Sequence, residues 1–160
     1  MGILSAVLSG CQDQPSAGYT SWKVYGGSSA NIKYSALDQV DTTNVTGLRP
    51  AWIYLSEGGD STKYGPMQCN PIVIDNTLYG VSPRLKLFAI DAATGKEKWQ
   101  FDPSDSIANR TWKRNSVNMN RGVAYWEEGD DKRILFTVGP IAFAVNVHPT
   151  SSIGHPKLLK

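Results

Sequence analysis

The stretch Ala89-Ile-Asp-Ala-Ala-Thr-Gly-Lys-Glu-Lys-Trp99 decides the fold of this chain, and it lies between short apolar runs. Asp91 and Thr94 are residue types whose side chains satisfy backbone groups in turns. Gly95 supplies the permissive backbone that such a turn needs. Ala89 and Trp99 stand on either side of the turn, and we expect the tryptophan to dock on a neighbouring sheet.

The strands predicted around this turn form a complete four-stranded antiparallel meander. Pro71–Ile74 and Thr77–Val81 flank Asp75–Asn76, a two-residue hairpin signal because asparagine tolerates a positive φ. Lys86–Ile90 supplies a third strand, and Lys98–Phe101 supplies a fourth after the Thr-Gly turn. A helical alternative is excluded because no segment sustains the apolar spacing of an amphipathic helix.

A second, partial copy of this unit follows. Its predicted strands are Gly122–Trp126, Arg133–Val138 and Ala142–Asn146, with a charged turn at Glu127–Lys132. The segment Leu87-Phe-Ala-Ile-Asp91 reappears as Ala142-Phe-Ala-Val-Asn146. No Thr-Gly turn or docking tryptophan comes next, so we expect this copy to lack its outer strand. Repetition at roughly 45 to 50 residues is typical of β-propellers, in which each blade buries a face on its neighbour.

The expected fold class is therefore all-β. We predict a β-propeller of four-stranded antiparallel blades, of which this chain holds about two together with one closing strand at Pro50–Tyr54. Five Trp, seven Tyr and fifteen Gly support the all-β assignment. The net charge of +2 is too small to indicate nucleic acid as a partner.

Only two cysteines occur, and their surroundings differ. Cys69 precedes a predicted strand, and we expect it to be a small buried thiol. Without a CxxC motif or a Cys/His cluster, a structural zinc site is not expected. Cys11 follows a short apolar run that ends in Leu8-Ser-Gly, which resembles a bacterial lipoprotein signal with a lipidated cysteine.

The lipoprotein interpretation predicts a membrane-anchored protein of the cell envelope that faces the periplasm. It divides the chain into a signal and polar tether (1–18), the propeller part (19–146) and a divergent irregular tail (147–160). The apolar run is short, however, and no Lys or Arg precedes it. The alternatives are that the true start lies upstream or that the segment is a frayed terminus.

A longer series of residues resembles one enzyme family. The series comprises, in chain order, Trp22, Tyr25-Gly-Gly-Ser28, Asn31, Tyr34-Ser35, Leu37, Asn44-Val45, Leu48, Ala51-Trp52, Gln68-Cys-Asn-Pro71, Leu78-Tyr79, the Ala89-to-Trp99 unit and Asn120-Arg-Gly-Val-Ala-Tyr-Trp126. Together these resemble the N-terminal part of the pyrroloquinoline quinone (PQQ)-dependent glucose and alcohol dehydrogenases. Many propellers share the Ala-to-Trp unit alone, whereas its combination with the lead-in and the Asn-Arg-Gly motif is much more specific.

The resemblance implies a propeller of about eight blades whose central channel holds PQQ, usually with a calcium ion. In that family, hydride passes from a sugar or alcohol carbon to the quinone, an aspartate takes the hydroxyl proton, and the metal polarises a quinone carbonyl. Electrons then leave to a respiratory acceptor. The calcium ligands and the catalytic aspartate belong to later blades, so no catalytic or metal-binding residue is assigned within this chain.

Two residues match the cofactor-contacting part of the family motifs. Arg121 corresponds to the arginine that reaches the quinone oxygens, where its cation can stabilise negative charge. Gln68 corresponds to an acidic or amide residue that contacts the cofactor. The structural alternatives are a blade-edge arginine and a loop amide that caps backbone groups. Alcohol-oxidising relatives often carry two adjacent cysteines near the position of Asn115 and Ser116, and their absence here favours the sugar-oxidising branch.

Two functions remain open from the sequence. The first is a fragment of a PQQ-dependent dehydrogenase for a sugar or an alcohol, inactive as given because the base and the metal site are absent. The second is a non-catalytic propeller-repeat lipoprotein that acts as a binding scaffold. Such a scaffold shares the repeat and the lipid anchor, but it has no reason to keep Asn120-Arg-Gly-Val-Ala-Tyr-Trp126.

Overall fold

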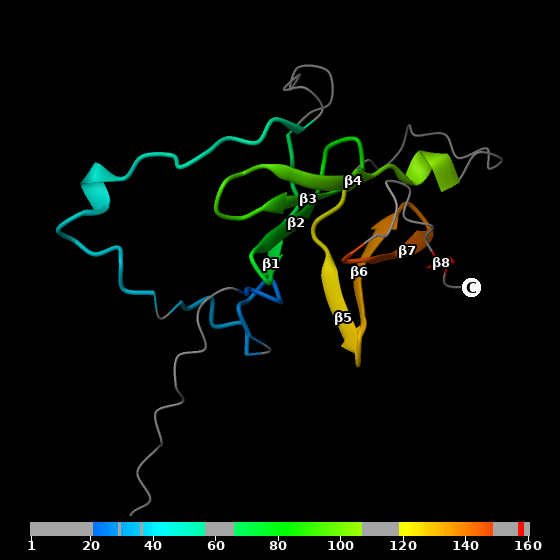
Figure 1. Ribbon diagram of the computed structural model, residues 1–160, viewed down its shortest axis with the longest axis horizontal. Coiled ribbons are helices and arrows are strands. Elements are labelled where there is room, and N and C mark those ends of the chain that lie inside the picture. Colours follow the sequence, from blue (N-terminus) through cyan, green and yellow to red (C-terminus); the bar gives the residue numbers. More distant parts are fainter. Residues whose placement is uncertain are drawn as a thin grey trace, which may run out of the picture.

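The computed structural model describes residues 21–28, 30–35, 37–56, 66–106, 119–148 and 157–158, and two four-stranded antiparallel sheets dominate this part of the chain (Figure 1). The first sheet has the order β1 (Ile72–Ile74), β2 (Thr77–Val81), β3 (Leu87–Asp91) and β4 (Glu97–Phe101). The second has the order β5 (Ala124–Glu128), β6 (Asp131–Val138), β7 (Ile141–Asn146) and β8 (Lys157–Leu158). Each strand pairs with its neighbour in sequence, as the predicted meanders require.

Helical structure is sparse in the described residues. The short 3₁₀ helices η1 (Val45–Gly47) and η3 (Pro103–Ser106) lie outside the two sheets. Within these same ranges, no helix is long and apolar enough to cross a membrane.

The β1–β2 hairpin turns on two residues with a left-handed backbone. Asp75 has φ 45° and Asn76 has φ 58°, and Ile74 pairs directly with Thr77 across the turn. Two consecutive positive φ values characterise the type I′ turn, whose twist matches that of the flanking strands. The hairpin predicted at these two positions is confirmed.

The β3–β4 turn is built on the carboxylate of Asp91. Its Oδ1 accepts hydrogen bonds from the backbone N–H of Ala93 (3.1 Å) and from the N–H and hydroxyl of Thr94 (both 2.9 Å). Gly95 then takes φ +71° and donates its N–H to the Asp91 carbonyl at 2.8 Å. The Thr94 hydrogen bonds hold the pKa of the Asp91 carboxyl below its usual value, because they favour the ionised form.

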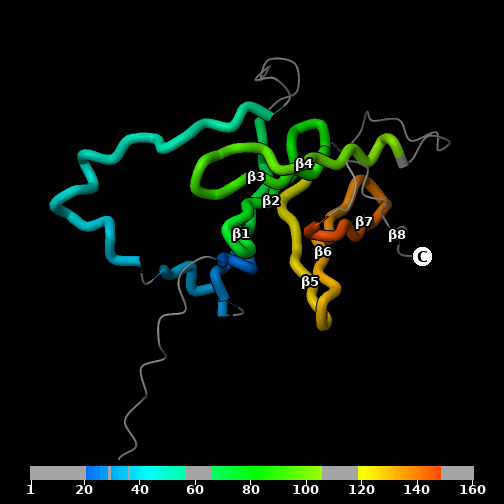
Figure 2. Tube along the Cα trace, viewed as in Figure 1, coloured from blue at the N-terminus to red at the C-terminus, as the bar shows by residue number. Residues whose placement is uncertain are grey.

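One face of the first sheet packs against one face of the second. The residues of this shared core are Cys69, Ile72, Ile74, Tyr79, Val81, Leu85, Leu87, Ala89, Phe101, Ile134, Phe136, Val138, Phe143, Val145 and Val147. The ring of Phe101, from β4, lies 6.2 Å from that of Phe136 and 5.8 Å from that of Phe143. The tube trace in Figure 2 shows the two sheets side by side. Face-to-face packing of successive meanders is the arrangement expected of neighbouring propeller blades.

An extended segment, residues 37–56, which we call the arm, runs out from the molecule and returns to contact the first sheet near its end (cyan in Figure 1). Trp52 donates its Nε1–H to the Ala92 carbonyl at 3.1 Å, and the Tyr54 ring lies 5.1 Å from that of Phe88. Ile53 and Leu55 point the other way and are 76% and 66% exposed. Side chains at residues 52–55 of the arm therefore point alternately toward the sheet and toward solvent, as in a strand.

The strand predicted at Pro50–Tyr54 is nevertheless wrong for the described structure. Residues 50–55 are irregular, and none of them pairs with a described strand. The segment docks on the first sheet through the side chains of Trp52 and Tyr54 rather than through a ladder of backbone hydrogen bonds. An extended backbone becomes a strand only where another strand lies alongside it.

The second sheet differs from its prediction at its outer edge. A short β8 pairs with β7 through Phe143–Leu158 and Ala144–Lys157, so the expectation that this copy lacks its outer strand is wrong. The N–H of Val147, within the predicted irregular tail, bonds the Lys132 carbonyl at 3.1 Å. The charged turn is also narrower than predicted, because β5 and β6 extend through it and leave only residues 129 and 130.

Candidate functional site

Two chain segments lie side by side where the first strands of the two sheets begin. Asn70 precedes β1 and Gly122 precedes β5, and the two form an isolated parallel bridge. The backbone N–H of Asn70 donates to the Arg121 carbonyl at 3.0 Å, and the Asn70 side chain donates its Nδ2–H to the same oxygen at 2.8 Å. This bridge brings the segments that carry Gln68 and Arg121 to a common edge of the molecule.

Arg121 is held in an exposed position by its neighbour in sequence. Asn120 is buried, and its Oδ1 accepts the N–H of Gly122 at 2.9 Å while its Nδ2 donates to the Thr137 carbonyl at 3.1 Å. The side chain of Arg121 is exposed, and its guanidinium makes no hydrogen bond or ion pair to another described residue. A cation without a partner is available to an anionic ligand.

Gln68 lies at the rim of a shallow pocket between the same segments. The pocket is lined by Pro66, Gln68, Val81, Ser82, Pro83, Met119 and Asn120. The β2–β3 loop on its wall is firmly structured: the Ser82 carbonyl accepts the N–H of Leu85 at 2.8 Å, and Leu85 is buried with φ +64°. The first sheet and the segment that leads into the second therefore frame one depression.

Cys69 lies directly behind this rim. Its thiol is free and buried, and its Sγ accepts the backbone N–H of Val81 at 3.2 Å. Burial raises the pKa of the thiol, because the low-dielectric surroundings disfavour the thiolate. The prediction of a small buried thiol is confirmed, since Cys69 belongs to the core shared by the two sheets.

The turn and tryptophan of the Ala-to-Trp unit lie away from this edge and contact different neighbours. Trp99 donates its Nε1–H to the Val147 carbonyl of the second sheet at 3.3 Å, and its ring lies 5.9 Å from that of Tyr79. Ala89 is fully buried and pairs with Trp99 across β3 and β4. Gly95 instead faces Trp52 of the arm.

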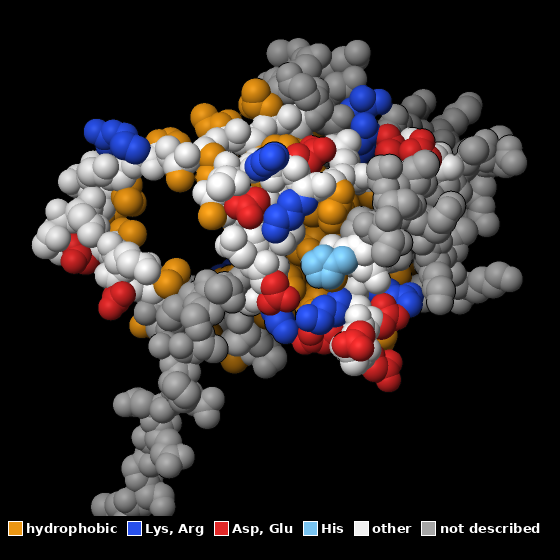
Figure 3. Space-filling view, viewed as in Figure 1, with side chains coloured by type: hydrophobic (Ala, Val, Ile, Leu, Met, Phe, Trp, Pro, Cys, Tyr) orange, Lys and Arg blue, Asp and Glu red, His pale blue; other side chains and the backbone are white. Residues whose placement is uncertain are grey.

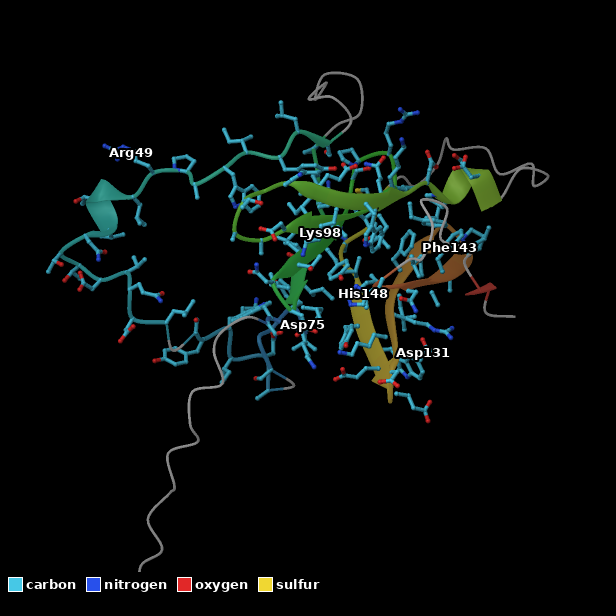
Figure 4. The ribbon with its side chains drawn as sticks, viewed as in Figure 1. Arg49, Asp75, Lys98, Asp131, Phe143 and His148 are labelled. Atoms are coloured by element: carbon cyan, nitrogen blue, oxygen red, sulfur yellow. The ribbon has the colours of Figure 1, made fainter. Side chains whose placement is uncertain are left out.

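The opposite end of the two sheets carries a mixed set of charges. Lys132 of β6 lies 3.7 Å from the Asp75 carboxylate of the first sheet, and Lys23 lies 2.8 Å from Glu127 of β5. Figure 4 shows Asp75 and Asp131 at this end, and Figure 3 shows basic and acidic side chains interspersed there. Exposed pairs of this kind contribute little to stability, and the described charges at this end are of both signs.

Gln68 lines the pocket, and Arg121 follows Asn120 of its lining in sequence, so the two side chains leave neighbouring segments. Arg121 offers a planar cation, and Gln68 offers an amide that can both donate and accept. Among the described residues, no group of three or more His, Cys, Asp or Glu side chains could hold a metal ion. Cys11 and the positions of Asn115 and Ser116 lie outside the described residues.

Sequence reasoning missed Asn70, which makes the double contact to Arg121. Asn70 forms part of the Gln68-to-Pro71 motif, but nothing in the sequence linked it to a segment 51 residues away. The one available signal was its position before Pro71, since a residue that precedes proline is restricted to extended backbone.

The comparisons with known proteins agree on one protein family. The family model described as "PQQ: Glucose/ethanol/alcohol dehydrogenase, beta-propeller domain" matches residues 22–148. The chain is 34% identical over 123 residues to quinoprotein glucose dehydrogenase A of Acinetobacter calcoaceticus, which covers 72% of this chain and 14% of that protein. It is 37% identical over 108 residues to the dehydrogenase subunit of the quinone alcohol dehydrogenase of Gluconacetobacter polyoxogenes, which covers 66% of this chain and 14% of that subunit.

The fold is likewise shared with solved structures. A quinohemoprotein alcohol dehydrogenase from Pseudomonas putida matches with a TM-score of 0.67 at 26% identity, over 86% of this chain and 18% of that one. The quinohemoprotein alcohol dehydrogenase from Comamonas testosteroni matches with a TM-score of 0.64 at 25% identity. These matches confirm the predicted all-β fold with part of a propeller. The chain spans about 14% of the length of the curated relatives named above.

Proposed function

Because this chain belongs to the PQQ-dependent glucose/ethanol/alcohol dehydrogenase β-propeller family, we propose that it contributes two blades to an oxidoreductase for an aldose sugar or an alcohol. The observation that carries the proposal is the bridge between Asn70 and Gly122, which brings Gln68 and Arg121 to one edge. These are the two residues that the family motifs assign to the cofactor.

The chemistry of the two side chains suits an ortho-quinone with carboxylate groups. PQQ, when bound, would supply a carbonyl pair that can accept one hydride, which carries both electrons, from the substrate carbon. Arg121 would stabilise negative charge on the oxygens of such a ligand through its fixed cationic fork. Gln68 would orient the ligand through its amide at the rim of the pocket.

Several finer features belong to this proposal. Of the two substrate classes, the absence of adjacent cysteines near Asn115 and Ser116 favours an aldose, and reduced cofactor passes its electrons to a respiratory acceptor. A calcium ion is held by residues of later blades, and these two blades alone have no turnover. Cys11 carries a lipid that anchors the protein to a membrane of the cell envelope, on the periplasmic side. Mass spectrometry of the membrane fraction tests the anchor, since lipidation adds acyl chains to the peptide that begins at Cys11.

The cofactor proposal is tested by titrating PQQ, with calcium present, into the polypeptide as its own gene expresses it. Quenching of tryptophan fluorescence reports binding. Arg121→Ala removes charge-assisted hydrogen bonds that each contribute about 1.5–3 kcal/mol, so the dissociation constant should rise by about tenfold or more.

Arg49→Ala is the matched control. Arg49 is also an exposed arginine, but it lies out on the arm, away from both sheets (Figure 4), and its Nη1 bonds only its neighbour's carbonyl among the described residues. The control should bind PQQ like the unmodified protein. An absence of saturable quenching would overturn the cofactor proposal and favour the non-catalytic scaffold. Equal affinity in the Arg121→Ala variant would remove Arg121 from the site.

A further inference from the structure

The backbone of Arg121 is held from both sheets at once. Its carbonyl oxygen accepts two hydrogen bonds from Asn70, one from the backbone N–H at 3.0 Å and one from the side-chain Nδ2 at 2.8 Å. Asn70 stands immediately before β1 and immediately before Pro71, which restricts its backbone to an extended conformation. The segment that leads into the first sheet therefore fixes the position of the Arg121 backbone at this edge of the molecule.

Asn120 fixes the same residue from the second sheet. Its Oδ1 accepts the N–H of Gly122, which bridges across Arg121, and its Nδ2 donates to the Thr137 carbonyl of β6. Asn120 is 92% buried, since only 8% of it is exposed, so both ends of its amide need these partners. A side chain that both donates and accepts at this position sets the backbone direction from which the Arg121 side chain leaves.

The guanidinium itself is not held by any of these contacts. Among the described residues it has no hydrogen-bond or ion-pair partner, although the Arg121 carbonyl accepts two hydrogen bonds from Asn70 and the flanking Asn120 and Gly122 are held by two more. The backbone of Arg121 is thus fixed while its exposed guanidinium keeps no partner among the described residues. This arrangement is useful where a ligand must find the cation already in place.

We propose that Asn70 and Asn120 are positioning residues that preorganise Arg121 for the cofactor. This inference rests on the proposed function. It assigns to the junction between the sheets a role in affinity, because Asn70 lies on the segment that leads into the first sheet and Asn120 on the segment that leads into the second.

The test measures PQQ affinity in single and double variants of the polypeptide as its gene expresses it. Asn70→Ala removes the side-chain bond and leaves the backbone bond, and we expect the dissociation constant to rise on the order of three- to tenfold. In an Arg121→Ala background the same substitution should change the dissociation constant by less than about twofold, because the residue through which it acts is gone. Asn120→Ala should behave in the same way.

A second readout separates positioning from general destabilisation. Binding through a well-placed cation weakens as salt is added, since ions screen the charge. The salt dependence of PQQ binding should therefore flatten in Asn70→Ala, towards that of Arg121→Ala. Asn146→Ala is the matched control: its Oδ1 also accepts an N–H two residues on, from His148 at 2.8 Å, but it stands at the end of β7 away from the site.

Each outcome decides the inference. Weakened binding and a flatter salt dependence in Asn70→Ala, both absent in the Arg121→Ala background, support it. Unchanged affinity, or an equal loss with and without Arg121, overturns it while leaving the proposed function intact. No saturable PQQ binding by the unmodified protein overturns both. Asn120 is buried, so where Asn120→Ala does not fold, the half-buried Asn70 decides the matter alone.

Discussion

Replacing Gly95 by alanine should loosen the arm from the first sheet. Gly95 has φ +71°, and a Cβ on it would lie 2.6 Å from Cδ2 of Trp52. The tryptophan ring cannot stay where it is, because real Cβ atoms do not approach other atoms so closely. Displacing the ring would break the hydrogen bond from Trp52 Nε1 to the Ala92 carbonyl, which is 3.1 Å long.

The magnitude has two separable parts. A side chain in the left-handed region costs about 1–2 kcal/mol relative to glycine. Loss of the Trp52 hydrogen bond adds about 0.5–1.5 kcal/mol, with a further loss of ring packing. Gly129 isolates the first part, because it has φ +57° and a Cβ there would meet nothing within 4 Å. We therefore expect Gly95→Ala to lower the free energy of unfolding by about 1–2 kcal/mol more than Gly129→Ala does.

Urea unfolding followed by tryptophan fluorescence measures both variants, and Trp52 itself reports on the arm. In a Trp52→Ala background the clash is absent, so the cost of Gly95→Ala should fall to that of Gly129→Ala. The reasoning is refuted if the two glycine substitutions cost the same amount in the unmodified protein. It is also refuted if the excess cost at Gly95 persists without the tryptophan.

Three further predictions concern the turns and the core. Thr94 holds the pKa of the Asp91 carboxyl low, so the ionised carboxylate stabilises the fold above about pH 4, and this stabilisation is lost as the pH falls through the folded-state pKa. In thermal unfolding at stepped pH, Asp91→Asn should therefore lose less stability than the unmodified protein as the pH is lowered. An unchanged pH dependence in Asp91→Asn would contradict the assignment. Phe143→Ala should lower the free energy of unfolding by about 3–5 kcal/mol in a urea titration, and both sheets should unfold together because Phe101 packs on this ring; separate transitions would argue against a shared core. Asn76→Gly should add up to about 1 kcal/mol to the free energy of unfolding and so raise the melting temperature slightly, because glycine adopts φ 58° without strain. A lower melting temperature would count against the type I′ assignment.

The strands and turns of the two sheets were predictable because their signals are local. Asp75–Asn76 and Thr94–Gly95 each place turn-forming residues between apolar runs, and both turns are where the sequence puts them. The prediction of a strand at Pro50–Tyr54 correctly implies an extended segment, in which Trp52 and Tyr54 are half-buried and Ile53 is exposed. It could not show that no described strand lies alongside, because pairing depends on residues distant in sequence.

The missed outer strand of the second sheet and the missed contact from Asn70 also depend on residues that are distant in sequence. A two-residue strand such as Lys157–Leu158 carries no periodicity, and only its pairing with β7 defines it. Family motifs pointed to Gln68 and Arg121 as separate residues, and the structure brings their segments to one edge. The contact from Asn70 that links them joins two segments that no pattern of spacing connects.

The aromatic cluster of Phe101, Phe136 and Phe143 has a consequence for how such a repeat can diverge. The last strand of one sheet supplies a ring to the interior of the next, so a tandem copy of a single sheet inherits an incomplete interior. A substitution that changes the size of a ring in one repeat must then be compensated by a substitution in the next repeat. Neighbouring repeats in such a chain should evolve as matched pairs, with substitutions on β4 tracking those on the following β6 and β7.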